Sequence, residues 1–232
     1  MGFLSYLISG VSLGSVYALI ALGYTMVYGI AKMLNFAHGD IIMVGSYVIF
    51  TATTMAGIPV PVAILASIII CTVLGVVIEG IAYRPLRGTS SLAVLITAIG
   101  VSYFLQNAVQ IIYGANAKSF KSVVPLKAVK LAGGELVISG ETIVTIISCV
   151  VIMVALNTFV NKTKTGHAML AVAEDRQAAE LMGINVNKTI SLTFAIGSGL
   201  AAVAGMLLCS AYPNLTPTTG AMPGIKAFTA AV

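Results

Sequence analysis

Long apolar stretches without charged side chains dominate this chain. The first stretch runs from Phe3 to Ala31, 29 residues without Asp, Glu, Lys or Arg. As an α-helix it would reach about 43 Å, which exceeds the hydrocarbon core of a bilayer at roughly 30 Å. We therefore expect one membrane-spanning helix here, tilted or broken to absorb the excess length.

Further apolar stretches predict an all-α, polytopic membrane protein with about six spans. They cover residues 41–58, 59–83, 91–113, 142–160 and 189–212. A seventh begins around Ala227, and the sequence stops inside it at Val232. We therefore expect residues 1–232 to form a single transmembrane domain whose C-terminal spans are missing. The first charged side chain is Lys32, so the basic segment of a cleavable signal peptide is lacking and the first stretch should remain as a span.

The composition supports this class and excludes others. Apolar residues make up 59% of the chain and charged residues 8%, against about 25% charged in an ordinary soluble domain. A disordered chain, a disulfide scaffold and a water-soluble globule are therefore excluded. The net charge is +5, but the basic side chains lie between apolar stretches rather than in one patch. We expect contact with membrane lipid and none with nucleic acid.

The cysteines and histidines predict neither a metal site nor a catalytic centre. Cys71, Cys149 and Cys209 each lie inside an apolar stretch, and His38 and His167 are far apart in the sequence. No CxxC or Cys/His ligand spacing is present. An intramembrane enzyme would need a nucleophile with a base, or a metal cluster, and is therefore the weakest alternative.

Glu79 lies near the end of the third apolar stretch, where a lone carboxylate is costly. An ion pair with Arg84 or Arg87 is the preferred explanation. A proton relay is the alternative, although no second carboxylate lies within a span.

The basic residues of the connectors predict the orientation. The connectors at 32–40, 84–90 and 161–188 carry seven Lys and Arg, whereas those at 55–60 and 114–141 carry four. Cytoplasmic connectors carry the excess of basic residues, so we expect the first set inside and the amino terminus outside. The long outer connector predicts a small hairpin, with extended pieces at 123–125 and 135–139 and a turn at Gly133-Gly134.

Polar residues mark two weak candidates for a translocation path. Asn35, His38 and Asp40 follow the first span closely, and Gln106 and Asn107 lie within the fourth stretch. The first group is either a break between half-helices that lines a cavity or an ordinary turn in which Asp40 caps the second span. We prefer the turn. The second group lines a path or joins helices by hydrogen bonds, and we prefer the joining role.

Stripes of small residues predict close packing between helices. Two such stripes occur, one in the first span and one in the sixth. They are formed by Gly10, Gly14 and Ala18, and by Gly197, Ala201 and Gly205.

The connector at 161–188 contains a short helical pattern. Asp175 can cap a helix that begins at Arg176, Arg176 and Glu180 lie on one face, and Gly183 suits the left-handed position after the helix. A helix this short needs a surface to pack on. That surface is either a groove of another protein or the lipid headgroup region, and the spacing alone leaves both open.

Several motifs in this order along the chain resemble one family. The segment QAAELMG at 177–183 resembles the EAAxxxG loop of ABC-importer permeases, although Gln177 stands where that motif has Glu. The wider stretch 171–184 is similar to the branched-chain amino acid permease family, most of all to its LivH-type subunits. NFAHGD at 35–40, YRPLRG at 83–88 and TAIG at 97–100 resemble the same family.

The resemblance implies an ABC-importer permease fold in a multi-pass protein of the bacterial inner membrane. It also implies partners: ATP-binding cassette subunits that hydrolyse ATP, a second, homologous permease subunit and an extracytoplasmic substrate-binding protein. It makes 161–188 a cytoplasmic coupling loop and implies a branched-chain or related amino acid as substrate. The residues it assigns to ATPase coupling are Glu174, Asp175, Arg176, Gln177, Ala178, Ala179, Glu180 and Gly183.

The sequence itself carries no GxxxxGK[ST] nucleotide motif, so we expect no ATP hydrolysis by this chain and no cofactor. The alternative function is a secondary transporter of a small solute. Such a protein would usually carry charged residues within its spans and an internal repeat, and neither is clear here.

Overall fold

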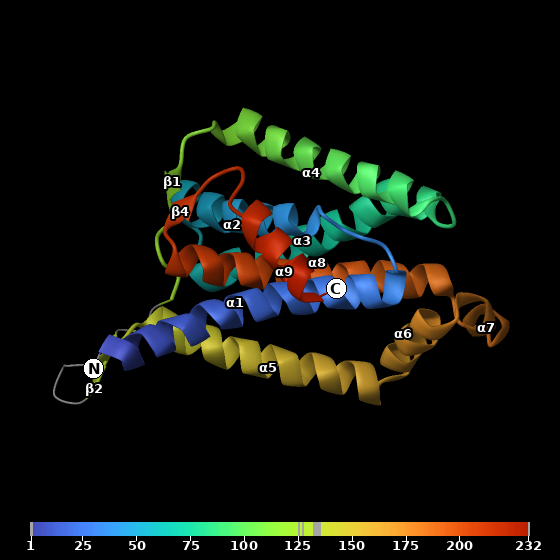
Figure 1. Cartoon of the computed structure of the whole chain (residues 1–232). Coiled ribbons are helices and arrows are strands. Elements are labelled where there is room, and N and C mark those ends of the chain that lie inside the picture. The colour runs from blue at the N-terminus through green and yellow to red at the C-terminus, as the bar shows by residue number, and fades with distance from the viewer. Residues whose placement is uncertain (1, 125, 127, 132–135, 232) are drawn as a thin grey trace.

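A computed structural model describes residues 2–124, 126, 128–131 and 136–231 of the chain. Within these residues, five helices are long and apolar enough to cross a membrane. They correspond to α1 (Gly2–Ala31), α3 (Val60–Ile78), α4 (Ser91–Tyr113), α5 (Gly140–Lys162) and α8 (Val186–Ala211), and the α3 span continues to Leu86. Figure 1 shows these helices lying alongside one another in a bundle, which confirms the all-α polytopic fold.

The second apolar stretch forms a shorter element than expected. It folds into α2 (His38–Phe50) and a π-helical turn, η1 (Thr51–Met55). The 13 residues of α2 extend about 20 Å, less than the hydrocarbon core. The start of the seventh stretch forms α9 (Ala221–Ala231). The described residues therefore contain one spanning-length helix fewer than the six stretches predicted.

Local signals in the sequence account for where the long helices begin and end. Ser90, Ser139 and Asn185 precede α4, α5 and α8, and each side chain accepts a hydrogen bond from a backbone N–H of the first turn. Such capping satisfies donors that a helix start would otherwise leave unpaired. The end of α3 widens into a π-helical turn, η2 (Glu79–Tyr83), and then tightens into a 3₁₀ turn, η3 (Arg84–Leu86).

The connectors sort to the two ends of the bundle as the charge distribution predicted. At one end lie the last turn of α1, the start of α4, and the short helices α6 (Lys164–Glu174) and α7 (Arg176–Leu181) (Figure 1). The amino terminus and the strands lie at the opposite end. The connectors richer in Lys and Arg therefore share one end, which is called the inner end below.

The outer connector forms the expected hairpin with a different first strand. β2 (Val129–Leu131) pairs antiparallel with β3 (Leu136–Ile138), and β1 (Lys118–Ser119) pairs with β4 (Asn214–Leu215). Val123 and Val124 belong to no strand, so the piece predicted at 123–125 does not pair in the hairpin. Pro125 and the predicted turn at 133–134 lie outside the described residues.

Helix α8 lies at the centre of the bundle and packs through its small residues. A Cβ on Gly205 would overlap the carbonyl oxygen of Ile42, and one on Gly197 would lie 2.9 Å from Cγ2 of Val27. The packing role predicted for this stripe is confirmed. The stripe in α1 behaves differently, because a Cβ on Gly10 or Gly14 would meet no atom within 4 Å in the part of the chain described here.

Candidate functional site

The connector between α5 and α8 folds as two helices, of which the sequence predicted one. Helix α6 begins after Thr163, whose Oγ1 accepts a hydrogen bond from the Gly166 N–H at 3.0 Å. Met169 and Val172 are buried three positions apart, on the face that packs inward. Gly166 permits the sharp entry, because a Cβ there would overlap the carbonyl oxygens of Phe159 and Val160. The cap and the buried pair are signals that could have identified α6.

Helix α7 has the termini that the sequence predicted. Asp175 Oδ1 accepts hydrogen bonds from the N–H groups of Gln177 at 2.8 Å and Ala178 at 3.1 Å. Gly183 has φ of +81°, the left-handed conformation that glycine adopts without strain. Its N–H donates to the Glu180 carbonyl at 2.9 Å. Asp175 as cap and Gly183 as terminator are therefore confirmed.

The predicted coupling residues divide between two faces of α7. Ala179 is 3% exposed and packs against the chain itself, whereas Leu181 is 89% and Met182 82% exposed. The exposed members of the predicted set are Glu174, Asp175, Gln177, Ala178, Glu180 and Gly183. The outward surface of α7 is thus apolar at its C-terminal end. Leu181 and Met182 belong to this surface, and the family motif did not single them out.

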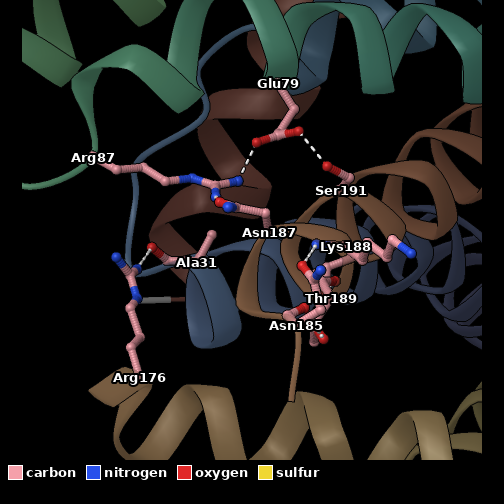
Figure 2. Close-up of polar contacts among 10 residues, drawn as sticks. Ala31, Glu79, Arg87, Arg176, Asn185, Asn187, Lys188, Thr189 and Ser191 are labelled. Atoms are coloured by element: carbon pink, nitrogen blue, oxygen red, sulfur yellow. Dashed lines mark hydrogen bonds and ion pairs between the residues drawn. The ribbon is translucent and has the colours of Figure 1, made fainter. Parts of the chain in front are cut away.

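Arg176 turns inward and contacts the end of α1. We expected it to share a face with Glu180, but its guanidinium donates a hydrogen bond to the carbonyl oxygen of Ala31 (Figure 2). No ion pair joins Arg176 to Glu180 among the described residues. The contact satisfies a carbonyl at the C-terminus of a helix, where a positive charge is favourable. Arg176 therefore links the short helix directly to the first span.

A second arginine ties the end of α3 to the start of α8. Arg87 forms an ion pair with Glu79, which confirms the predicted pairing, and also donates to Oδ1 of Asn187. Ser191 Oγ donates to the other carboxylate oxygen of Glu79 at 2.5 Å (Figure 2). Burial lowers the pKa of the Arg87 guanidinium, and the Glu79 carboxylate opposes that shift. We call Glu79, Arg87, Asn187 and Ser191 the inner clamp.

The segment between α1 and α2 is largely buried. Asn35 is 2% exposed, its N–H donates to the Tyr24 hydroxyl at 3.2 Å, and its Oδ1 accepts from the Tyr83 hydroxyl at 2.9 Å. Met33 and Ala37 are buried beside it. A turn is present at 36–37, as preferred, but most of the segment is buried in the bundle. Its polar side chains find their hydrogen-bond partners on other helices, which its composition alone does not reveal.

Asp40 and His38 complete this buried polar cluster. Residue Ala37 occupies the cap position of α2 without a side-chain hydrogen bond, so the prediction that Asp40 caps the helix is wrong. Asp40 Oδ1 instead accepts from Gln106 Nε2 of α4 at 2.9 Å. His38 stands edge-on to Tyr24, and its Nε2 has no hydrogen-bond partner within the described residues.

The structure brings four of the five weak path candidates together. Gln106 reaches Asp40 and thereby joins α4 to α2, as the preferred joining role predicts. Asn107 is exposed and donates to the Tyr103 carbonyl of its own helix at 2.7 Å, so it lies apart from the cluster. Among the described residues, no three His, Cys, Asp or Glu side chains gather as a metal site would require.

A bundle of apolar helices of spanning length, joined by connectors at its two ends, defines a multi-pass helical membrane protein. The family model described as the permease component of the branched-chain amino acid transport system matches residues 6–232. The chain belongs to this family. That membership decides between the permease and the secondary transporter in favour of the permease.

Similar proteins support the assignment. The high-affinity branched-chain amino acid transport system permease protein BraD of Pseudomonas aeruginosa is 45% identical, over 99% of this chain and 78% of its own length. The LivH protein of Escherichia coli, of the same description, is 44% identical over the same shares. A probable LivH permease of Methanocaldococcus jannaschii is 28% identical over 92% of this chain and 68% of its own. No solved structure matches the chain.

The bacterial relatives and the apolar helices place the protein in the inner membrane as a multi-pass protein.

Proposed function

We propose that this chain is the membrane subunit of an ATP-driven importer of branched-chain amino acids, and that α7 docks on an ATP-binding cassette subunit. The observation that carries the proposal is the exposure of Leu181 and Met182 at 89% and 82% on a capped helix at the inner end. Exposed apolar side chains in such a setting favour a protein groove. The names of the bacterial relatives supply the substrate class.

The charges around α7 favour a protein partner over lipid headgroups. Helices that lie on a membrane surface carry Lys and Arg on their polar face. The polar side chains around Leu181 and Met182 include the exposed carboxylates of Glu174, Asp175 and Glu180. The cytoplasmic leaflet is negatively charged and would repel them.

Two connections would carry a movement of α7 into the spans. Arg176 holds the C-terminal carbonyl of α1, and α8 begins only a few residues after Gly183. A rigid-body displacement of α7, driven by ATP binding and hydrolysis in the partner subunits, would therefore act on α1 and α8 together. An importer of this kind also needs a second permease subunit and an extracytoplasmic binding protein, and we include both in the proposal.

The buried polar cluster is our candidate for the path. Asn35, His38, Asp40 and Gln106 gather where the backbone leaves the helical form between α1 and α2. Non-helical backbone at membrane depth is tolerated where it is buried in protein or lines a cavity. The exposed position of Asn107 separates it from this candidate.

Co-purification tests the docking surface directly. The permease is expressed with tagged ATPase subunits of the same source, as the wild type, as Leu181→Asp and as the control Leu126→Asp. Leu126 is also exposed, at 52%, but lies in the outer connector. Ala179→Asp is unsuitable, because that side chain is buried and the variant would test folding.

We expect the wild type and Leu126→Asp to be captured and Leu181→Asp to be lost while remaining monodisperse in detergent. Capture of Leu181→Asp at the wild-type level would show that the docking surface lies elsewhere. A folded wild-type chain that captures no ATPase would overturn the proposed function.

A further inference from the structure

A polar cavity opens at the outer end of the bundle, away from both sites described above. Its volume is about 500 Å³, within the range of small-molecule sites. It lies between residues 9–16 of α1, the first turn of α5, the end of α8 and the outer connector at Ser122. Six Ser and Thr side chains line it: Ser9, Ser12, Ser122, Ser139, Thr142 and Ser210. We call this cavity the outer pocket.

One carboxylate stands among these hydroxyls. Glu141 lies in the first turn of α5, and its Oε1 accepts a hydrogen bond from Ser122 Oγ at 2.9 Å. Among the lining residues that the structure describes there is no Lys, Arg or His. A single negative charge with hydroxyl neighbours favours a ligand with one positive group. A divalent cation would call for more oxygen ligands of higher charge.

The rest of the lining is mainly apolar. It includes Leu13 and Val16 of α1 and Ala211 and Pro213 at the end of α8, and Val16 is 1% exposed. From α1 the exposed Ser9 and the buried Ser12 both line the cavity. The outer pocket therefore offers a carboxylate, hydroxyls and an aliphatic wall within one cavity.

We propose that the outer pocket binds a free amino acid, with Glu141 facing its ammonium group and Leu13 and Val16 facing its aliphatic side chain. The choice of an amino acid rests on the proposed function, whereas the charge preference rests on the pocket alone. The hydroxyls and the N-terminal turn of α5 face the carboxylate of the ligand. The pocket is thus a site on the permease itself, at the end where an imported solute arrives.

A cysteine reporter tests the charge preference. The three native cysteines are buried, so a cysteine at the exposed position Ser9 provides a selective label. In the assembled permease–ATPase complex without binding protein, the Ser9→Cys side chain is modified with a cationic and an anionic methanethiosulfonate of similar size. We expect the cationic reagent to react up to about thirtyfold faster, because a unit charge about 4 Å away contributes about 1 kcal/mol in water, favourable for the cation and unfavourable for the anion. Glu141→Gln should lower the preference to that of a free cysteine in solution, whose thiolate already favours the cationic reagent, and Lys121→Gln, on the same connector, should keep the wild-type preference.

Ligand protection tests the amino acid itself. Leucine at millimolar concentration should slow the cationic modification of Ser9→Cys, and 4-methylpentanoate, which lacks the ammonium group, should not. Glu141→Gln should remove the protection by leucine. Absence of protection in the Ser9→Cys complex would overturn the inference.

Two further outcomes separate this inference from its alternatives. Protection that appears only when a substrate-free binding protein is added would assign the pocket to a side chain of that protein and would also overturn the inference. Because the ATPase capture assay is independent of the label, captured ATPase without protection by leucine would leave the proposed function intact.

Discussion

Helices α5 and α8 are both apolar, both long enough to span a membrane, and they occupy opposite environments. In its most apolar 18-residue window, α8 has 67% of its residues buried, whereas α5 has 11%. Helix α5 is nevertheless the more apolar of the two. Its exposed residues are large and aliphatic, among them Ile147, Val151 and Val154.

The difference shows that residue size, rather than hydropathy, decides which span enters the bundle centre. Lipid tails are as apolar as a protein core, so burial of an apolar helix gains little from the hydrophobic effect in a membrane. Close backbone approach and polar anchors decide instead. In α8, Gly197 and Gly205 allow the close approach. Ser191 and Asn187 of the inner clamp are its polar anchors. Helix α5 has its single glycine, Gly140, at its first residue.

The largest effect should come from removing one partner of the inner clamp. Glu79→Leu leaves Arg87 buried without its counter-charge, and we expect a loss of about 3–5 kcal/mol in the free energy of unfolding. The double variant Glu79→Leu/Arg87→Met should recover most of this loss. Denaturation in detergent micelles measures both. Equal losses in the two variants would show that the ion pair does not anchor α8.

A smaller effect should follow from one added methyl group on α8. Gly205→Ala places a Cβ against the carbonyl oxygen of Ile42, and we expect a loss of about 1–3 kcal/mol. Gly100→Ala on α4 is the control, because its Cβ would meet no atom within 4 Å among the described residues. The control should be neutral or slightly stabilising. If the two variants unfold at the same denaturant concentration, close packing does not set the place of α8.

The segment that joins α5 to α8 should respond locally. Asp175→Ala removes the acceptor for two N–H groups at the start of α7, which costs about 1 kcal/mol of helix stability. Faster hydrogen exchange of the α7 amides is the expected result, with the spans unchanged. Glu174→Ala is the control, and equally fast exchange in that variant would point to loss of charge rather than loss of the cap.

The smallest effect is expected on the exposed face of α5. Val151 is 60% exposed, so Val151→Leu should change the free energy of unfolding by less than about 0.5 kcal/mol. The contrasting substitution Ala201→Leu adds three carbons at a fully buried position of α8 and should destabilise clearly. A marked loss in Val151→Leu would mean that α5 packs against protein rather than lipid.

The spans and the ends of α7 could be predicted from the sequence because their signals are local. A run of uncharged apolar residues is sufficient for a span, and Asp175 and Gly183 act on backbone groups two or three positions away. The Glu79–Arg87 pair was also predictable, because a carboxylate at that depth requires a cation and Arg87 follows about two turns later.

The buried cluster and the inward turn of Arg176 could not be predicted, because they depend on partners far away in the sequence. Asn35 bonds to Tyr83 and Asp40 to Gln106, and Arg176 reaches Ala31. From the sequence alone NFAHGD favours an ordinary turn. Its burial becomes visible only when the third span and α4 are placed against it. For the same reason the sequence grouped Ala179 with the docking residues, whereas the packing of α7 buries it and leaves Leu181 outward.

Helix α1 runs from the outer pocket to the contact with Arg176. Its 30 residues extend about 45 Å, with Ser9 and Ser12 near one end and Ala31 at the other. A helix is stiff along its axis, since every turn is braced by hydrogen bonds to the next. An axial push on the last carbonyls therefore shifts the serines by nearly the same amount. A displacement at the Arg176 contact would thus reach the outer pocket along the axis of α1, with no relay of side chains required between them.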